Sequence, residues 1–377
     1  MKDKACILVP GTLGLGLVLY LYHRYFRENR KNAHGDVIEE RNSPNGTFKG
    51  RRDSELRIES LKPEAIRIFK SIAPPLDFKS HKGQGGRIAI VGGSKDYTGA
   101  PYYAGMAALK TGAELLYMFA SAEASPALKV YSPELMVTPF YGTSLCSGTN
   151  EWVSRTASII TERMKRFHAI VIGPGMGRNK HLVPVIRNVL HEAARAKIPT
   201  VLDADGVWAV CQDPEMLNQA GMVVLTPNKV EFEKLYTSVM QVERKLDGDL
   251  KADVESLCRK LNNAVIIRKG RSDFISNGII SLECVEMGAP KRSGGIGDVL
   301  AGVTATCVAW AQMKSSLSPK QDFKESQKNI VYAAHCACSI VRKAWEITFS
   351  DCGRGSCVPD LLDKLRSVIN SIEAAAC

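Results

Sequence analysis

Residues 291–303 read KRSGGIGDVLAGV, and they place three glycines directly before Asp298 and an apolar run. Glycine inside a regular element costs roughly 0.5–1 kcal/mol through lost chain entropy, so this cluster needs a physical reason. The apolar residues after Asp298 have helical spacing, and we expect a helix that begins near Asp298. Amide groups at the start of a helix attract anions, and glycines let a phosphate approach them closely. The stretch therefore predicts a phosphate-binding site at a helix N-terminus.

Asp298 follows these glycines, although a carboxylate beside an anion site repels a phosphate. Its presence favours a chemical role, and we expect it to take a proton from an attacking hydroxyl group. The alternative is that Asp298 only caps the helix. The phosphate loop of the P-loop enzymes is excluded, because the pattern G-x-x-x-x-G-K-[ST] occurs nowhere in the chain.

Short apolar stretches alternate with helical patterns from Leu56 onward, which is typical of a mostly parallel sheet with helices on both faces. The predicted strands are residues 87–93, 115–120, 168–175, 199–206, 222–228 and 264–270. Residues 273–285 have the pattern of a hairpin that turns at Asn277-Gly278, and the chain after it is almost wholly helical. Thr98 is a candidate N-cap for the helix after the first strand. We predict a single α/β domain over residues 53–377.

Polar residues follow several of these strands, where open α/β sheets bind their ligands. Asn228 and Glu231 have the spacing of a capping box, which spacing alone favours, or of a pair that holds Mg²⁺ through water. Asp203 and Asp205 follow another predicted strand, and we expect one of them to cap a helix. The other either binds a metal ion or the substrate, or has no such role. Lys269 belongs either to a polar turn or to a nucleotide phosphate site.

Residues 173–178 read GPGMGR and follow a predicted strand. They indicate a tight turn that lets backbone approach a ligand. The dinucleotide fingerprint G-x-G-x-x-G is not matched here, which disfavours an NAD-linked oxidoreductase. Taken together, the signals at the strand ends favour ATP-dependent phosphoryl transfer to a hydroxyl group.

The bulk composition is that of a globular protein, with 377 residues, 45% hydrophobic residues and 24% charged residues. The net charge is +11, but residues 1–52 hold ten basic and five acidic residues, so much of the excess precedes the predicted domain. No patch interleaves basic and aromatic residues, and we expect no nucleic-acid partner. The eleven cysteines lack C-x-x-C pairs, so we expect thiols in a reducing compartment rather than zinc ligands.

Residues 5–22 form an uncharged apolar stretch that is long enough to span a bilayer. A basic flank follows at residues 23–31 and favours a cytosolic orientation of the rest of the chain. We expect a membrane anchor, and the alternative is a targeting segment, with the mitochondrion as one destination. Residues 32–52 are polar and read as a linker.

Six stretches of the chain carry a family resemblance: KGQGGRIAIVGGSKDYTGAPYYAGMAALKTGAELLYMF, GPGMGR, VLDADGVW, LTPNKVEFEKL, RKG and RSGGIGDVLAGV. In the same order, they resemble the ATP-dependent NAD(P)H-hydrate dehydratases of the ribokinase-like superfamily. The resemblance extends from about residue 56 to residue 370. It implies a ribokinase-like fold and an enzyme that returns the S epimer of hydrated NADH or NADPH to the reduced cofactor while ATP becomes ADP and phosphate.

The same resemblance assigns roles to individual positions, with Asp298 as the catalytic residue in contact with the hydrate. The ATP-binding residues that it implies are Lys269, Gly270, Arg271, Ser272, Asp273, Gly288, Ala289, Pro290, Lys291, Arg292, Ser293, Gly294, Gly295, Ile296 and Gly297. The hydrate-binding residues that it implies are Gly175, Gly177, Asn228, Lys229, Val230, Glu231, Phe232, Glu233 and Lys234. Mg²⁺ is the expected cofactor, with Asn228 and Glu231 as its water-mediated ligands.

Further expectations concern partners and rival functions. We expect a homo-oligomer, a separate NAD(P)H-hydrate epimerase as the functional partner, and membrane contact through residues 5–22. The main rival is a ribokinase-like kinase that phosphorylates a small alcohol and leaves the phosphate on its product. A membrane-anchored nucleotide-binding protein without catalysis is a second rival, and the presence of Asp298 argues against it.

Overall fold

The computed structural model describes residues 61–142, 147–244, 248–317 and 323–375. These residues belong to one compact unit, Arg51–Cys377. The predicted anchor at residues 5–22 and the linker that follows it lie outside the described residues. Within the described residues, one helix, Ile296–Ser316, is long and apolar enough to cross a membrane, but 72% of its apolar window is buried inside the fold. We identify it as a core helix.

The described strands form one nine-stranded sheet in the order β3-β2-β1-β4-β5-β6-β7-β8-β9. The strands are β1 (Arg87–Val91), β2 (Leu115–Ser121), β3 (Leu135–Tyr141), β4 (Ala169–Ile172), β5 (Thr200–Leu202), β6 (Val223–Leu225), β7 (Val265–Arg268), β8 (Asp273–Ser276) and β9 (Ser281–Cys284). All pairs from β3 to β7 are parallel, whereas β8 and β9 continue the sheet antiparallel. The carboxyl ends of β1 to β7 therefore meet at one edge of the sheet.

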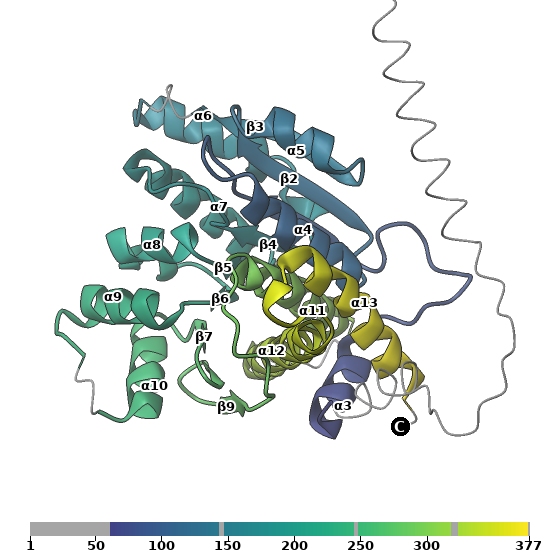
Figure 1. The fold of residues 1–377 in the computed structure, drawn as a ribbon. Coiled ribbons are helices and arrows are strands. Elements are labelled where there is room, and N and C mark those ends of the chain that lie inside the picture. The colour runs from purple at the N-terminus through teal and green to yellow at the C-terminus, as the bar shows by residue number, and fades with distance from the viewer. Residues whose placement is uncertain (1–60, 143–146, 245–247, 318–322, 376–377) are drawn as a thin grey trace, which may run out of the picture. The chain divides into compact units, whose positions relative to one another are not determined.

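Helices cover both faces of the sheet and enclose two hydrophobic cores (Figure 1). The helices of one face are α3 (Pro63–Ile72), α4 (Gly99–Thr111), α5 (Ser125–Tyr131), α11 (Ile296–Ser316), α12 (Phe323–Cys352) and α13 (Val358–Ala374). The other face carries α6 (Asn150–Thr161), α7 (Val183–Arg195), α8 (Asp205–Gln212), α9 (Lys229–Met240) and α10 (Leu250–Lys260). The predicted α/β fold, with a mostly parallel sheet and helices on both faces, is confirmed.

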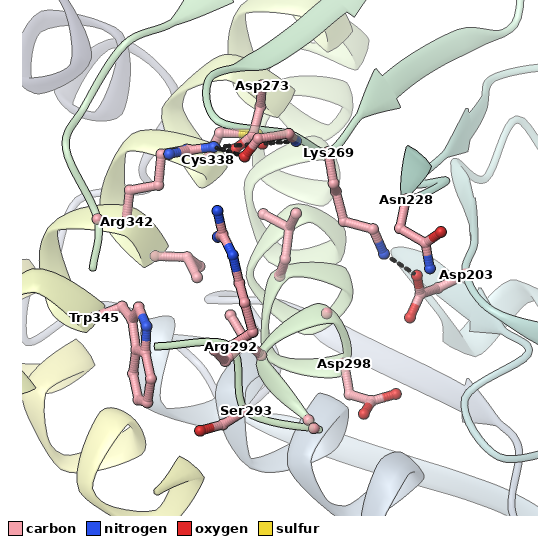
Figure 2. Close-up of a pocket in the computed structure, with 18 of the residues that line it drawn as sticks. Asp203, Asn228, Lys269, Asp273, Arg292, Ser293, Asp298, Cys338, Arg342 and Trp345 are labelled. Carbon is pink, nitrogen blue, oxygen red and sulfur yellow. Dashed lines mark hydrogen bonds and ion pairs between the residues drawn. The ribbon is translucent and has the colours of Figure 1, made fainter. Parts of the chain in front are cut away.

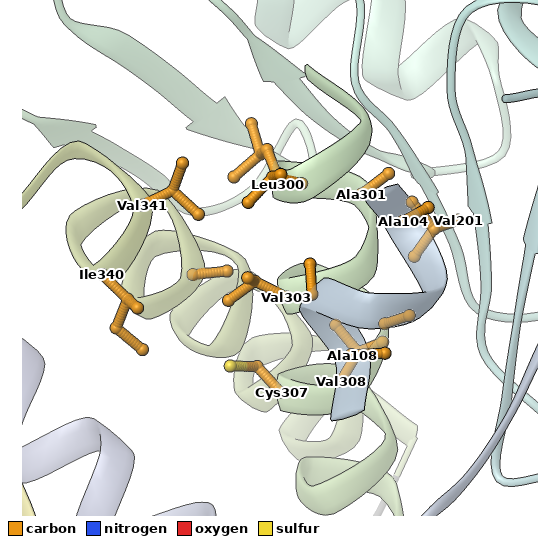
Figure 3. Close-up of a cluster of buried hydrophobic side chains, with 14 of the residues drawn as sticks. Ala104, Ala108, Val201, Leu300, Ala301, Val303, Cys307, Val308, Ile340 and Val341 are labelled. Atoms are coloured by element: carbon orange, nitrogen blue, oxygen red, sulfur yellow. The ribbon is translucent and has the colours of Figure 1, made fainter. Parts of the chain in front are cut away.

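Helix α11 lies at the centre of the first core, as Figure 3 shows. Leu300 and Val303 face α12 there, and burying each such side chain contributes about 1.5–3 kcal/mol. On its other side α11 packs closely on α4, because a side chain at Gly302 would lie 2.0 Å from the carbonyl oxygen of Ala104. Helix α11 is therefore held on all sides, and its first turn has a defined position at the sheet edge.

Several local predictions can be compared with the structure. The β8–β9 hairpin forms as predicted, and the Asn277 side chain accepts hydrogen bonds from the amides of Ile279 and Ile280. Helix α4 begins after Thr98 as predicted, but the Thr98 side chain does not cap it, because its Oγ1 lies 2.7 Å from the hydroxyl oxygen of Tyr131. Strand β3 was not predicted. It is an edge strand that contains Pro139, and proline weakens a strand pattern.

Candidate active site

A cavity of about 510 Å³ opens at the carboxyl ends of β5, β6 and β7, against the first turn of α11 (Figure 2). Its described lining residues are Asp203, Ala204, Asn228, Glu231, Lys269, Gly270, Asp273, Gly288, Ala289, Arg292, Ser293, Gly294, Gly295, Ile296, Gly297, Asp298, Leu300, Cys338, Val341, Arg342 and Trp345. Its volume is in the usual range for a small-molecule site. The cavity lies where α/β sheets of this kind bind ligands.

The glycine cluster forms the start of α11. Gly295 is the N-cap residue, with a positive φ of 96°, and a side chain there would come within 2.9 Å of both Tyr103 and Val358. A side chain at Gly294 would meet no protein atom within 4 Å, so this position leaves free space beside the backbone. The N-cap residue is a glycine, so it has no side chain that could bond to the amides of the first turn. The amides of Ile296 and Gly297 thus remain available to an anion in the cavity, which is the ligand that the sequence predicts.

Asp298 is the third residue of α11, whose N-cap residue is Gly295, and it lines the cavity. Asp298 therefore does not occupy the N-cap position that the alternative role requires. Burial raises the pKa of Asp298 to about 7, and the negative charge of Asp203 adds to the increase while Lys269 opposes it. A carboxylate with this pKa is a much stronger base than an exposed aspartate and still ionises near neutral pH.

Lys269 and Asp203 form an ion pair at the same end of the cavity as Asp298 (Figure 2). The Lys269 Nζ donates to Asp203 Oδ1 over 3.0 Å, and the Thr226 hydroxyl donates to the same oxygen over 2.5 Å. Burial alone would lower the pKa of Lys269, but the carboxylates of Asp203 and Glu231 raise it above its usual value. The Lys269 Nζ also lies 3.2 Å from the position that a Cβ atom on Gly297 would occupy. A positive charge is thus held beside the open amides.

Asn228 and Glu231 form the predicted capping box at the start of α9, and both also line the cavity. The Asn228 Oδ1 accepts from the amides of Val230 and Glu231 over 2.9 and 3.0 Å, and Glu231 Oε2 accepts from the Asn228 amide over 2.9 Å. The cap fixes the orientation of both side chains at the cavity wall. Capping and ligand binding are therefore compatible roles for this pair.

Helix α12 supplies one wall of the cavity, and none of its residues was predicted to belong to the site. Arg342 donates from Nε and Nη2 to the two carboxylate oxygens of Asp273, over 2.6 and 2.7 Å. It also donates to the carbonyl oxygens of Gly270, Arg271 and Glu286, over 2.9, 2.9 and 3.2 Å. Arg342 therefore joins the loop after β7 to the chain after β9.

A signal for this wall is present in the sequence. Cys338, Val341, Arg342 and Trp345 recur at intervals of three and four residues, which places them on one helix face. An arginine within such an otherwise apolar face is unusual for a core helix. The pattern cannot show which cavity the face borders, because that depends on the packing of α12.

The structure brings most of the predicted ATP-binding residues to the cavity, with four exceptions. Arg271, Ser272, Pro290 and Lys291 do not line it. The Lys291 ammonium group turns away and donates to the carbonyl oxygens of Arg354, over 2.7 Å, and Ser356. The Ser272 hydroxyl bonds to Glu283.

Of the predicted hydrate-binding residues, Asn228, Glu231 and Asp298 line the cavity, and the others lie outside it. Gly175 and Gly177 belong to the turn after β4, where the Gly177 amide donates to Asp205 Oδ2 over 2.9 Å. Phe232 is fully buried in the second core, so its side chain faces away from any ligand. The remaining positions, Lys229, Val230, Glu233 and Lys234, lie on α9.

The comparisons with known proteins agree with one another. The family model described as NAD(P)H-hydrate dehydratase matches residues 88–366. The chain is 36% identical over 307 residues to the ATP-dependent (S)-NAD(P)H-hydrate dehydratase of Mus musculus, covering 81% of this chain and 85% of that one. It is 36% identical over 309 residues to the protein of the same name from Schizosaccharomyces pombe, covering 80% of this chain and 91% of that one.

Two solved structures share the fold. A ribokinase-like superfamily protein from Enterococcus faecalis matches with a TM-score of 0.60 at 19% identity, over 81% of this chain and 94% of that one. The ADP/ATP-dependent NAD(P)H-hydrate dehydratase from Bacillus subtilis, co-crystallized with ATP/Mg²⁺, matches with a TM-score of 0.57 at 22% identity, over 81% and 97%. From the cavity at the edge of a ribokinase-like sheet and the match of model and relatives over most of the chain, we conclude that this protein belongs to the NAD(P)H-hydrate dehydratase family.

Proposed function

We propose that this protein catalyses the ATP-dependent dehydration of the S epimer of hydrated NADH or NADPH and releases the reduced cofactor, ADP and phosphate. One observation carries the proposal: Asp298, with a pKa near 7, stands next to the open amides of α11 and the Lys269–Asp203 ion pair. This arrangement joins a base, an anion site and a positive charge in one cavity. The names of the relatives support the choice of substrate.

The cavity suits phosphoryl transfer, in which a protein mainly positions the reactants and neutralises charge. The amides of residues 294–297 would bind the phosphoryl group that is transferred, because they are the open donors closest along the chain to Asp298. Lys269 would neutralise the charge that develops on this group, and its ion pair with Asp203 keeps the ammonium group in place.

Asp298 would act as the general base. Its carboxylate takes the proton of the ring hydroxyl group while the hydroxyl oxygen forms a bond to the terminal phosphorus of ATP. The bond between that phosphorus and the bridging oxygen breaks, and its electron pair leaves with ADP. The lone pair of the ring nitrogen then expels phosphate from the ring carbon, and loss of a proton from the neighbouring carbon restores the dihydronicotinamide.

Mg²⁺ fits the donor atoms that the cavity offers. It prefers oxygen ligands and keeps several waters, and Asn228 and Glu231 bring oxygen atoms to the cavity wall. In the described ranges, no group of three or more His, Cys, Asp or Glu side chains could hold a metal ion. Asn228 and Glu231 would therefore hold the ion through water, beside the phosphates of ATP. When bound, the ion would neutralise part of the phosphate charge.

The remaining parts of the proposal concern the chain as a whole. Residues 53–377 would form the catalytic domain, and residues 1–52 would provide an anchor or targeting segment with a linker. A separate epimerase would supply the S epimer from its R counterpart, since the proposed reaction uses only the S form. We also propose that the protein works as a homo-oligomer.

The proposal is tested by incubating the purified full-length protein with hydrated NADH, Mg²⁺ and ATP. The expected result is recovery of the dihydronicotinamide absorbance in step with formation of ADP and free phosphate. Asp298→Ala should abolish turnover while ATP still binds. A product that retains the phosphate would instead identify a kinase for a small alcohol, and redox change without ATP would identify an oxidoreductase.

A further inference from the structure

Large apolar side chains are exposed at the edge of the sheet opposite the cavity. Helix α11 begins at the cavity and runs to this other edge over 21 residues, a distance of about 30 Å. There the Lys314 ammonium group donates to the carbonyl oxygen of Ser71, so the end of α11 meets the end of α3. Leu317, at the end of α11, is 83% exposed. In the loop that joins α3 to β1, residues 73–86, Leu76 is 79% exposed and Phe78 is fully exposed.

Hydrogen bonds hold the α3–β1 loop in a defined conformation. Asp77 Oδ1 accepts from the Lys79 amide over 2.8 Å and from the Ser80 hydroxyl over 3.1 Å, so the Asp77 side chain turns toward its own loop. Further along, the Gly85 carbonyl oxygen accepts from Nε1 of Trp310, a core residue of α11, over 2.6 Å. Figure 1 shows the loop, in blue, projecting beyond the helices. The apolar side chains therefore lie on a built projection of the domain.

Exposed basic residues lie along the same edge. They come from the α3–β1 loop and from the turns that lead into β4 and β5: Lys79, Lys82, Lys165, Arg166 and Lys197. Strands β1, β4 and β5 are neighbours in the sheet, so these residues share the middle of the edge. Within the described ranges, none of them forms an ion pair. Asp77 and Glu162 are the exposed carboxylates of these turns, so a positive surplus remains.

Exposed apolar side chains beside a basic surface match the surface of an anionic lipid bilayer. Phe and Leu side chains enter the boundary between headgroups and acyl chains, and each Lys or Arg near an anionic leaflet strengthens binding about fivefold. The uncharged apolar stretch at residues 5–22 of the same chain is long enough to span a bilayer. A second copy of the chain fits this surface less well, because a symmetric contact would bring two basic edges together.

We propose that the edge of the sheet opposite the cavity docks on an anionic lipid bilayer, with Leu76 and Phe78 among the lipid headgroups. The basic residues of the edge then lie against the lipid phosphates. The docking surface lies outside the cavity lining, so it is separate from the proposed reaction. Because the cavity is at the other edge of the sheet, it faces away from the bilayer and stays open to soluble substrates.

The test measures hydrogen–deuterium exchange of the full-length protein with vesicles of phosphatidylcholine, either alone or mixed with phosphatidylserine. Residues 5–22 are present with both kinds of vesicle, so the difference in exchange reports the effect of the anionic lipid on the loop. Amides of residues 76–82 should exchange about fivefold or more slowly with the anionic vesicles than with the neutral ones. About 0.5 M NaCl should remove this difference, because salt screens charges at a surface.

Replacing the two apolar side chains tests whether they enter the lipid. Leu76→Ser/Phe78→Ser should lose most of the protection of the loop with anionic vesicles. Its unfolding midpoint should match that of the wild type, since both side chains are exposed. Met287→Ser is the matched control, because Met287 is 82% exposed and follows β9 at the cavity edge, and it should keep the protection.

Reversing the charge of the loop tests the electrostatic part. Lys79→Glu/Lys82→Glu should lose the protection, whereas Lys95→Glu/Lys180→Glu should keep it, since Lys95 and Lys180 are exposed and follow β1 and β4 at the cavity edge. Equal exchange with both kinds of vesicle, or protection that persists in both loop variants, would overturn the proposal. Protection that appears without vesicles and grows with protein concentration would also overturn it, and would identify a contact between copies of the chain. Absence of dehydration by the wild type would leave these exchange rates unaffected.

Discussion

Replacing Asp298 with asparagine should abolish dehydration and, at the same time, stabilise the folded protein above pH 7. Asparagine has nearly the same shape but cannot accept the hydroxyl proton, so the proposed general base is lost. It also carries no charge, and the ionised carboxylate is held in an unfavourable place. Burial and the negative charge of Asp203 oppose its ionisation. The substitution is therefore expected to abolish activity and, at the same time, to increase the free energy of unfolding.

The size of the stabilisation follows from the pKa of Asp298, which rises from 3.8 to about 7 on folding. Each pKa unit corresponds to about 1.4 kcal/mol, so the ionised side chain lowers the free energy of unfolding by about 4 kcal/mol at most. Partial access of solvent reduces this to about 2–4 kcal/mol. Between the two pKa values the folded state keeps a proton that the unfolded state has lost, so wild-type stability falls as pH rises through this window. Below pH 3.8 both states are protonated and the difference vanishes.

Urea unfolding of wild type and Asp298→Asn at pH 8, 6 and 4 measures this dependence, and a turnover assay accompanies it. The variant should be more stable by about 2–4 kcal/mol at pH 8 and nearly equal to wild type at pH 4. Asp96→Asn is the matched control, since Asp96 is exposed, and should show little change at any pH. If Asp298→Asn is no more stable than wild type at pH 8, the carboxylate is not destabilised by its surroundings. If it retains turnover, Asp298 is not the base.

The remaining predictions concern the pH profile and two positioning features. In the wild type, kcat/KM should rise about tenfold per pH unit below about pH 7 and level off above it, because protonated Asp298 cannot accept a proton. A flat pH profile of kcat/KM between about pH 5 and 8 would contradict the assignment of Asp298 as the base. Arg342→Gln should raise the KM for ATP about tenfold or more with a smaller change in kcat, because its bonds to the loops beside the cavity are lost. Steady-state kinetics with Arg342→Lys as partial rescue checks this, and a fall in kcat alone would argue against a positioning role. Gly295→Ala should lower the free energy of unfolding by about 1–3 kcal/mol, since its φ is positive and a side chain would press on Tyr103 and Val358. Thermal unfolding measures it, and an unchanged midpoint would show that the loop can relax.

Local features of the fold and site were predictable from the chain. The strands of the parallel sheet are short apolar runs, the hairpin has its Asn-Gly turn, and the glycines before Asp298 mark the start of α11. Asn228 and Glu231 were recognisable as a capping box, which the structure shows. Each of these depends on residues within a few positions of one another. Strand β3 was not predicted, because its edge position and Pro139 weaken the apolar pattern that marks a strand in the sequence.

Contacts between distant segments were not predictable in the same way. Asp203 lies 66 residues before its partner Lys269, and Arg342 lies 69 residues after its partner Asp273. Only the order of the strands and the packing of α12 bring these charges together. The sequence also cannot show that Lys291 turns away from the cavity while Arg292 projects into it.

The sequence by itself determined the alternation of strands and helices, the glycine-rich start of α11 and the position of Asp298 beside it, because periodicity and turn preference act over a few residues. The tertiary structure alone decided which charges are neutralised and how far the pKa of Asp298 rises. Those properties depend on distances through space and on the exclusion of water, and both arise only when the sheet and α12 close around the cavity.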